Sequence, residues 1–326
     1  MTDGHFARIA AFGILLALAA LGAAAQSYPS RPVKLVVPYP PGGVADILAR
    51  TVGQRLGEQW GQPVIVENRP GAAQVVGAEA VARSPADGYT LLVSEGATFV
   101  INPHLCRKLP YDSLKDFTPL VVLCQISPVI AVNASLPASS VEELIALAKA
   151  RPGSLSYGSM GSGSYAHISM EQFKQLAGVD IVHVPYKGSA PATTDLLSGR
   201  IGVMLVSLSI VEPHAKAGKL RILAATTAKR LALRPELPTV AEAALPGFES
   251  GTWFAVLGPA NLPRDIVAKV HADVTGIIGV REFREQNFTK LGLEPVAITP
   301  EQFGQMMKSD LERWGNLVKA TGAKVD

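Results

Sequence analysis

Continuous apolar runs alternate with helical patterns along most of the chain. Residues 33–37 form an apolar, β-branched run that predicts a strand, and the Pro- and Gly-rich segment at 38–43 cannot continue it. Over residues 45–58 the apolar side chains recur at helical spacing, and a Gly-Gln-Pro sequence at 61–63 ends the unit. Because the strands are unbroken apolar runs joined by helices, the pattern predicts a mostly parallel sheet that helices cover on both faces.

The same alternation continues towards the C-terminus. Further strands are predicted at residues 64–66, 89–93, 129–132, 155–157, 181–184, 201–206 and 220–224. Further helices are predicted at residues 73–83, 140–150, 265–278, 280–291 and 300–320. Two such sets of strands and helices in one chain predict two α/β lobes that face a cleft.

Three turns rich in small residues follow predicted strands, at residues 40–43, 94–98 and 159–164. Ligands of open α/β sheets bind beyond the carboxyl ends of the strands, which is where these turns lie. Each turn offers backbone N–H groups close to the start of a helix, and such a helix N-terminus can hold a carboxylate without Arg or Lys. Three turns of this kind favour an anion-binding cleft over glycines that only reverse the chain.

Composition and the N-terminus narrow the class of protein. Of the 326 residues only 17% are charged and the formal net charge is +3, which argues against a nucleic-acid-binding protein. Arg8 precedes an apolar run at residues 9–21, and three alanines follow at 23–25. This pattern predicts a signal peptide over residues 1–25, cleaved before Gln26, and a periplasmic mature protein. The alternative, a retained membrane anchor, needs a run of about 20 apolar residues, and this run is shorter.

Export would place the two cysteines, Cys106 and Cys124, in a compartment that permits disulfides. A bond between them would close a loop of about 18 residues and could stabilise the fold by roughly 3 kcal/mol. The alternative is two separate, small buried side chains. Neither cysteine has a second Cys or a His at the spacing of a metal site, so no metal is expected.

Catalytic and cofactor motifs are weak. Residues 161–166 match the relaxed dinucleotide fingerprint G-x-G-x-x-A, but the acidic residue expected after the next strand is missing, so no cofactor is expected. No Ser has the flanking glycines of a nucleophile elbow, and the histidines show no zinc-binding spacing. An exported α/β hydrolase therefore remains only as an alternative. His167, early in the helix after the third turn, is the histidine placed nearest to a ligand.

Several sequence blocks occur together in one order. The first is Pro-Tyr-Pro-Pro-Gly-Gly at residues 38–43, with Asp46 three residues on. The others lie at residues 66–71, 85–92, 101–103, 109–112, 183–188, 217–221 and 237–242. In this order the blocks resemble the Bug-type (TctC-like) receptors, the extracytoplasmic solute-binding proteins of tripartite tricarboxylate transporters. The resemblance runs from about Tyr28 to the C-terminus.

The resemblance implies an α/β fold of the two-lobed periplasmic-binding-protein (Venus flytrap, type II) class, with a ligand cleft between the lobes. Domain 1 would comprise residues 26–126 and 250–326, and domain 2 residues 127–249. The implied function is capture of a small organic carboxylate for the membrane subunits of a tripartite tricarboxylate transporter, by a monomer that is not an enzyme. A receptor that presents its ligand to a membrane signalling protein would use the same binding chemistry and stays open.

The resemblance also implies which residues bind the ligand. In domain 1 they are Tyr39, Gly42, Gly43 and Ala45 of the first turn, and Ser94, Ala97 and Thr98 of the second. In domain 2 they are Ser159, Gly163, Ser164, Tyr165 and His167 of the third turn, with Ser207 after a later strand. The expectation from the strand–turn–helix pattern, that helix N-termini face the cleft, agrees with these positions.

One position departs from the pattern expected of the family, and a second is unusual beside an anion site. Many members carry an Asp where this chain has Val206, and valine cannot pair with an ammonium group. The sequence therefore predicts a di- or tricarboxylate or an aromatic carboxylate as ligand, rather than an amino acid. Glu95, in the second turn, is unusual near an anion site; it either points to solvent or accepts a hydrogen bond from a ligand hydroxyl.

Overall fold

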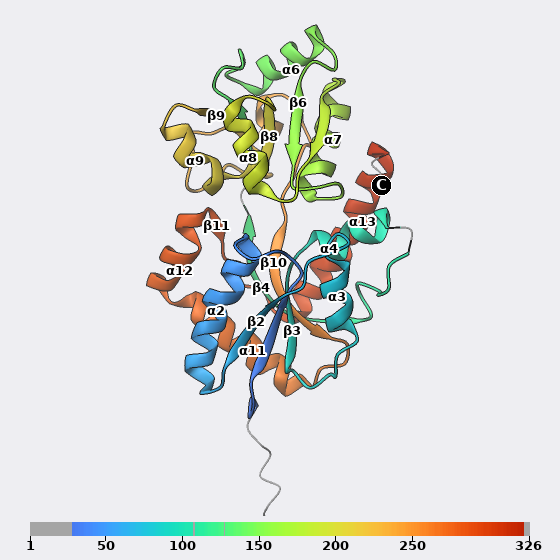
Figure 1. Cartoon of the computed structure of the whole chain (residues 1–326), viewed down its shortest axis with the longest axis vertical. Helices are drawn as coiled ribbons and strands as arrows, with labels where there is room; N and C mark the ends of the chain where they lie inside the picture. The colour runs from blue at the N-terminus through green and yellow to red at the C-terminus, as the bar shows by residue number, and fades with distance from the viewer. Residues whose placement is uncertain (1–27, 107, 127, 323–326) are drawn as a thin grey trace, which may run out of the picture.

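The computed structural model describes residues 28–106, 108–126 and 128–322. The predicted signal peptide and its cleavage site before Gln26 lie outside these residues. Within the described ranges, no helix has the length and apolar character needed to cross a membrane. Two sheets organise the rest of the chain, one in each of two lobes (Figure 1).

Lobe 1 is built on a six-stranded sheet of order β11-β4-β10-β3-β1-β2. Its strands are β1 (Val33–Val37), β2 (Val64–Asn68), β3 (Thr90–Glu95), β4 (Phe117–Ile126), β10 (Trp253–Pro259) and β11 (Leu293–Glu294). Its helices are α2 (Val44–Trp60), α3 (Val75–Ala82), α4 (Ala97–Val100), α5 (Asn102–Leu105), α11 (Arg264–Gly279), α12 (Arg281–Asn287), a 3₁₀ turn (Thr289–Leu291) and α13 (Pro300–Thr321). The apolar strand positions that the sequence pattern identified, such as Leu35 and Leu91, are fully buried in this lobe.

Lobe 2 is built on a five-stranded sheet of order β7-β6-β8-β5-β9. Its strands are β5 (Pro128–Asn133), β6 (Ser156–Ser159), β7 (Val182–Pro185), β8 (Val203–Ser207) and β9 (Leu220–Ala225). Its helices are α6 (Val141–Ala150), α7 (Tyr165–Ala177), α8 (Ser189–Ser198), α9 (Leu208–Lys216) and α10 (Val240–Ala243). The strands on either side of the lobe change are β4 and β5 on the outward path, and β9 and β10 on the return. The exact domain boundaries stay a prediction.

The sheets are mixed, so the prediction of a mostly parallel sheet is wrong. β1 lies parallel to β2 and β3, and β6 lies parallel to β7 and β8. However, β10 lies antiparallel to both β3 and β4, and β5 lies antiparallel to both β8 and β9. The reason is the path of the chain: β4 leads out of lobe 1 and β10 leads back into the middle of its sheet, so the two neighbours run in opposite directions.

Most predicted elements are confirmed, with shifted ends. The strand at 33–37 and the helix over 45–58 correspond to β1 and α2. The helix predicted from residue 73 begins only at Val75, because Ala73 and Gln74 have left-handed φ values of 51° and 72°. The helix predicted at 280–291 is divided into α12 and the 3₁₀ turn. β4 and β10 were not predicted.

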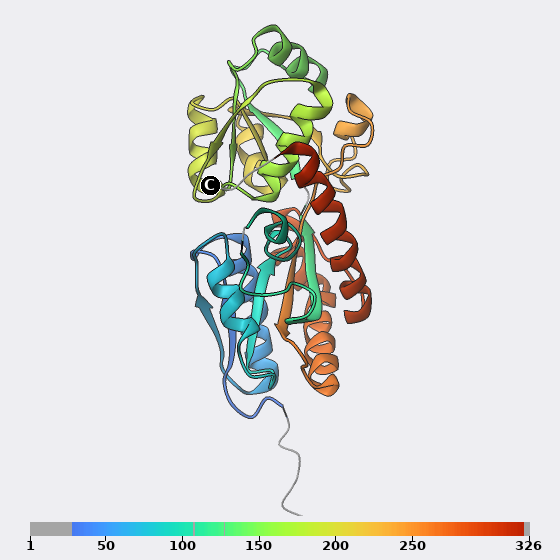
Figure 2. The ribbon, with the colours of Figure 1, turned by 90° about the vertical axis from the view of Figure 1, so that its right-hand side faces the viewer.

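Polar contacts and one long helix join the lobes. Thr226, just after β9, donates from Oγ1 to the carbonyl of Pro128 at 3.0 Å, and its other acceptor is the carbonyl of Ser250 at 3.3 Å. The Oγ atoms of Ser250 and Ser169 on α7 lie 2.5 Å apart. α13 packs against α4, α5 and β4 of lobe 1 and against α7 of lobe 2 (Figure 2). Hydrogen bonds therefore hold Ser250, on the path from β9 to β10, to residues of lobe 2, and α13 contacts both lobes.

The structure contains two free cysteines rather than the disulfide considered above. Cys124 is fully buried within β4, in register with Phe254 of β10. Cys106 ends α5 and is partly exposed. Both thiols are free, and burial raises the pKa of Cys124 well above its ordinary value. Enclosure of Cys124 in the sheet interior fits the alternative of two separate side chains.

Candidate ligand-binding site

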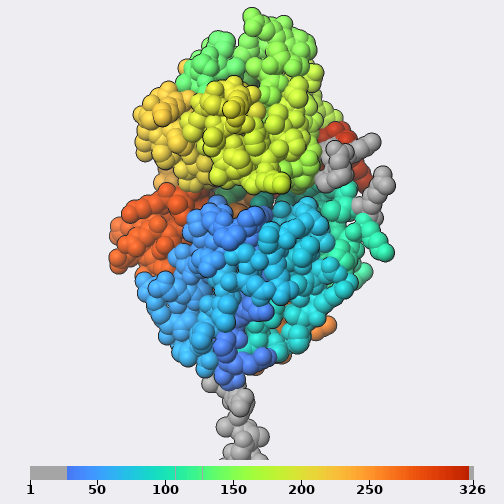
Figure 3. Space-filling model, viewed as in Figure 1, coloured from blue at the N-terminus to red at the C-terminus, as the bar shows by residue number. Residues whose placement is uncertain are grey.

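The turns selected from the sequence lie at the carboxyl edges of the two sheets. β1 and β3 run parallel with Leu35 opposite Leu91, so the turns that follow them share one edge of lobe 1. β6 and β8 are parallel too, which places the ends of these strands at one edge of lobe 2. Glu95 in lobe 1 is close enough to Tyr165 in lobe 2 for its charge to raise the pKa of Tyr165, after the larger effect of burial. In the space-filling view the lobes meet along a band across the middle of the molecule (Figure 3).

The first turn presents the N-terminus of α2. Gly42 has a left-handed φ of 88°, and Gly43 is the N-cap residue, with no side chain capping the helix. A Cβ atom built at either glycine would meet nothing within 4 Å, so the backbone here borders open space. Because α2 is a helix of 17 residues with an uncapped N-terminus, its first N–H groups, including that of Ala45, can receive an anion.

Asp46 holds this turn in shape. Its Oδ2 accepts from the N–H of Gly42 at 2.9 Å, and its Oδ1 accepts from Nδ2 of Asn68 at 2.9 Å. Arg50, one helical turn on, forms an ion pair with the same carboxylate at 2.9 Å. Partial burial acts to raise the pKa of Asp46, but the hydrogen bonds from Arg50, Gly42 and Asn68 outweigh it and lower that pKa. Asn68 also donates to the carbonyl of Tyr39 at 3.1 Å. Asp46, the Asp of the sequence motif, therefore holds the turn both directly, through Gly42, and indirectly, through Asn68.

The second turn is more enclosed than the first. Ser94 and Thr98 are fully buried, and their hydroxyl oxygens lie 2.8 Å apart. Ala97, at the start of the short helix α4, is buried beside them. Glu95 differs, because its Oε1 is buried and has no hydrogen-bond partner among the described residues. The alternative in which Glu95 points to solvent is therefore wrong for this oxygen.

The third turn pairs its polar groups internally. Ser164 is the N-cap of α7 and accepts from the N–H of His167 at 3.3 Å. Nδ1 of His167 accepts in turn from the N–H of Gly163 at 3.1 Å, and the Ser164 hydroxyl donates to the carbonyl of Gly161 at 2.7 Å. Burial lowers the pKa of His167, so this ring is neutral near pH 7. Tyr165, the first residue of α7, is buried at the same place.

Sequence reasoning singled out Ser159 but missed the histidine beside it. Oγ of Ser159 lies 2.7 Å from Nε2 of His183, on the neighbouring strand β7. The His183 ring stacks between Tyr157, at 4.9 Å, and His167, at 4.0 Å between centroids. Burial, followed by the charge of His167, lowers the pKa of His183 to about 4. His183 could have been found from the parallel register that sets it opposite Tyr157. That register can be used only once β6 and β7 are known to be neighbours.

Val206 and Ser207 are the last two residues of β8, in lobe 2. Ser207 is buried, and its hydroxyl lies 3.1 Å from that of Ser209. Val206 is almost completely buried in an apolar cluster with Ala131 and Leu208. This position therefore offers no acceptor to a cationic ligand group.

A family model described as the tripartite tricarboxylate transporter family receptor matches residues 48–323. The chain belongs to this family. Protein BugT of Bordetella pertussis is 37% identical to it over 320 residues, which cover 97% of this chain and 98% of BugT. The family resemblance of the sequence blocks is thereby confirmed, and with it the receptor class.

Solved structures of relatives share the fold of this receptor. A structure described as R. palustris Rpa4515 with adipate superposes with a TM-score of 0.86 at 38% identity, covering 92% of this chain and all of the other. MatC from Rhodopseudomonas palustris with bound malate gives a TM-score of 0.81 at 30% identity, with 89% of this chain and all of the other covered. Periplasmic binding protein BugD gives 0.82 at 29% identity, with 91% and 99% covered. The two-lobed α/β class expected from the sequence is therefore confirmed.

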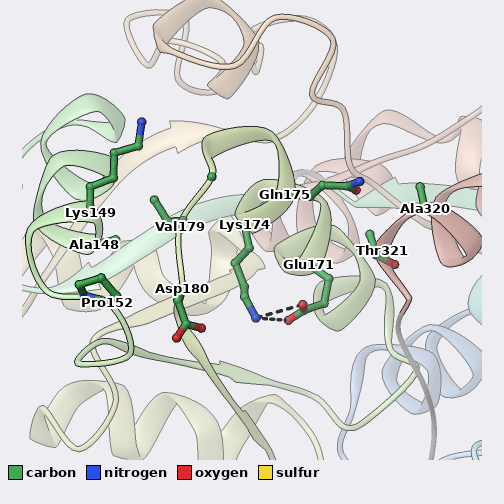
Figure 4. Close-up of a pocket in the computed structure, with 11 residues that line it drawn as sticks. Ala148, Lys149, Pro152, Glu171, Lys174, Gln175, Val179, Asp180, Ala320 and Thr321 are labelled. Atoms are coloured by element: carbon green, nitrogen blue, oxygen red, sulfur yellow. Dashed lines mark hydrogen bonds and ion pairs between the residues drawn. The ribbon is translucent and has the colours of Figure 1, made fainter.

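A pocket of the receptor lies away from these turns. It has a volume of about 540 Å³ and lies between α6, α7 and the end of α13 (Figure 4). Glu171 and Lys174 pair across 2.9 Å in its wall, and none of the predicted ligand-binding residues lines it. Among the described residues, no group of three His, Cys, Asp or Glu side chains is arranged to hold a metal ion.

Proposed function

We propose that this receptor captures a small organic carboxylate between its lobes for a tripartite tricarboxylate transporter. The single observation that carries the proposal is the uncapped N-terminus of α2, which lies at the same sheet edge as the turn after β3. Backbone N–H groups and the helix dipole stabilise a carboxylate there without a cationic side chain. A ligand that binds the closed arrangement of the lobes more tightly than the open one would shift the population towards the closed state, by the difference between its two affinities.

The binding set that we propose is the one the resemblance implies. On lobe 1 it comprises Tyr39, Gly42, Gly43, Ala45, Ser94, Ala97 and Thr98, and on lobe 2 Ser159, Gly163, Ser164, Tyr165, His167 and Ser207. Their positions at facing strand ends support this assignment. Several of the side chains are enclosed, so we expect the backbone and the Tyr39 hydroxyl to make most of the direct contacts on lobe 1.

The ligand that we propose is a di- or tricarboxylate or an aromatic carboxylate without an ammonium group. Val206 packs in an apolar cluster and supplies no acceptor for a cation. The relatives solved with adipate and with malate have dicarboxylates of this kind in their structures. Malate and aspartate form a matched test pair, since they differ in a hydroxyl against an ammonium group. Tight, specific binding of aspartate or glutamate would contradict this ligand class.

Mass spectrometry of ligand released from the purified mature protein, followed by a thermal-shift screen of organic acids, tests the function. A ligand at a hundredfold excess over Kd should stabilise the protein by about 2.7 kcal/mol. Gly42→Ala should remove most of this gain, because alanine disfavours the left-handed φ that shapes the turn. Gly218→Ala is the matched control: its φ is 72° and the space around it is also open, but it lies outside the site. If no carboxylate shifts the melting temperature, the proposal fails.

Export and assembly are further parts of the proposal. We place the cleavage of the signal peptide before Gln26, the mature chain in the periplasm, and the membrane subunits of the transporter as its partners. We also expect a monomer. The intact mass of the exported protein and its mass in solution by light scattering check the cleavage site and the monomer directly.

One observation favours the hydrolase alternative, namely the 2.7 Å contact between Ser159 and His183. A nucleophile of this kind needs a base that a third group orients, and stacking between two rings together with a pKa of about 4 makes His183 a weak base. Turnover of an ester or amide that Ser159→Ala abolishes would support the enzyme. A sensing role would instead appear as ligand-dependent binding to a membrane signalling protein.

A further inference from the structure

Glu95 is the last residue of β3 and stands at the carboxyl edge of the lobe 1 sheet. Although the residue as a whole is partly exposed, its Oε1 is buried and has no hydrogen-bond partner among the described residues. The hydroxyl oxygen of Tyr39, in the turn after the neighbouring strand β1, is also buried without a partner there. An unpaired buried polar group costs about 1 to 3 kcal/mol, so two of them at one sheet edge mark a place that a polar ligand group would stabilise.

The groups closest to Glu95 do not compensate a negative charge. Tyr39 from the first turn and Tyr165 from α7 are phenols whose pKa burial raises well above the ordinary value, so both are neutral. Thr252, just before β10, contributes a hydroxyl. α4, which follows the turn, contains no titratable residue.

The charged groups on the surrounding helices are also unable to serve Glu95. On α2, Asp46 and Arg50 pair with each other at 2.9 Å. On α7, burial lowers the pKa of His167 and so keeps that ring neutral. Burial raises the pKa of Glu95 to about 7, against the smaller opposing effects of the Thr252 and Tyr39 hydroxyls.

An ionised Glu95 would repel the carboxylate of the proposed ligand, whereas a protonated carboxyl donates a hydrogen bond. We propose that protonated Glu95 donates its carboxyl O–H, and Tyr39 its phenol O–H, to one carboxylate group of the ligand, so that the ligand binds together with one proton. This inference rests on the proposed function, because it names the residues that select a carboxylate in the same cleft. A buried acid that stays neutral near pH 7 can serve as a donor in this way. The proton is taken from solution, so the protonated Glu95 and the bound carboxylate together carry one negative charge instead of two.

The proposal has a distinctive pH signature. The negative charge of a bound ligand raises the pKa of Glu95 further, so the free protein loses its proton at a lower pH than the complex does. Above about pH 7, Kd should therefore rise by up to tenfold per pH unit, as linkage to one proton requires. Below about pH 6 both forms are protonated and Kd should be constant. Adipate is a suitable probe, because its own carboxyls remain ionised throughout the range from pH 7 to 9.

Calorimetry with adipate between pH 6 and 9, in buffers of different ionisation enthalpy, measures both Kd and the number of protons taken up. Wild type should take up close to one proton at pH 8. Glu95→Gln keeps a neutral donor of the same shape, so it should bind with a Kd within a few-fold of wild type at pH 6 and should show no rise towards pH 9. Glu95→Ala should bind more weakly at every pH. Glu142→Gln, an exposed glutamate on α6, is the matched control and should behave as wild type.

The outcomes separate the two proposals. If carboxylates bind but Kd is flat from pH 7 to 9, or if Glu95→Gln is as pH-dependent as wild type, this inference is wrong and the proposed function stands. If aspartate binds tightly and Glu95→Gln abolishes it, Glu95 is an acceptor for an ammonium group and the inference is also wrong. A readout that needs no ligand is infrared spectroscopy of the free protein, where the band of a protonated carboxyl should be present at pH 6 and missing in Glu95→Gln. Absence of that band in wild type overturns the inference even if no carboxylate is found to bind.

Discussion

On the lobe 2 side of the candidate site, the polar groups of the third turn pair with one another. Ser164 caps α7, and His167 accepts from Gly163 within the same turn. On the lobe 1 side, the N-terminus of α2 is uncapped, and the oxygens of Tyr39 and Glu95 are buried without partners. The two sides thus differ in how much hydrogen bonding they leave for a ligand.

This difference predicts an order of events. Lobe 1 offers unpaired donors, so a carboxylate gains most by binding there first. Lobe 2 is already satisfied internally and can close as a preformed surface without losing hydrogen bonds of its own. We therefore expect substitutions in lobe 1 to change affinity strongly, and those in the third turn to change mainly stability.

The largest effect on stability is expected for Asp46→Ala. The substitution leaves the N–H of Gly42, the amide of Asn68 and the charge of Arg50 without their shared acceptor. Loss of a largely buried, charged partner of this kind costs about 3 kcal/mol. Urea unfolding should show this loss, and calorimetry should show weaker carboxylate binding. Asp46→Asn retains an acceptor for Gly42 and should lose less; equal losses would mean that the hydrogen bond to the turn is unimportant.

The next largest effect is a gain of stability in Glu95→Gln above pH 7. The pKa of Glu95 is raised from 4.5 to about 7 in the folded state, so its ionisation destabilises the fold progressively from pH 4.5 and fully above pH 7. Glutamine cannot ionise, and the variant should be more stable than wild type by about 3 kcal/mol at pH 8. At pH 4 the difference should vanish. Urea unfolding at both pH values checks this, and equal stability at pH 8 would contradict the burial argument.

A smaller loss is expected for Ser164→Ala, which removes the cap of α7. Loss of an N-cap hydroxyl costs about 1 kcal/mol. Ser140→Ala is the matched control, because Ser140 caps α6 in the same lobe by accepting from the N–H of Glu143 at 3.2 Å. Both variants should lose similar stability in thermal melts. Ser140→Ala should keep the affinity of wild type, and Ser164→Ala, which lies in the proposed binding set, should lose less affinity than Gly42→Ala. A much larger loss of affinity in Ser164→Ala would break the contrast between the lobes.

Local sequence signals account for much of the fold but not for its strand order. β1 and α2 follow directly from an apolar run and a helical period. β4 and β10 contain apolar runs too, yet β4 is interrupted by Pro119, and β10 belongs to lobe 1 only because the chain returns there after lobe 2. Pairing between strands so far apart in sequence leaves no trace in local periodicity, which is why the mixed sheet was not predicted.

The candidate site shows the same division. Its turns could be located from glycines after strands, because a left-handed residue such as Gly42 is a local requirement. The protonation state of Glu95 could not be predicted, since it depends on burial and on the hydroxyls of Thr252 and Tyr39, which come from other parts of the chain. The sequence alone therefore left the role of this residue open between two alternatives.

The last comparison is one of slopes against pH and concerns His183, on the lobe 2 side. Its pKa is lowered from 6.5 to about 4, so the stability that its neutral form provides is present above pH 6.5 and is lost as the pH falls towards 4. Glu95 acts in the opposite direction between pH 4.5 and 7, so in wild type the two effects partly cancel. Glu95→Gln should therefore show a steeper loss of melting temperature on acidification below pH 6.5 than wild type does. Adding His183→Gln should flatten that slope, and equal slopes in the single and double variants would show that His183 is not kept neutral by the fold.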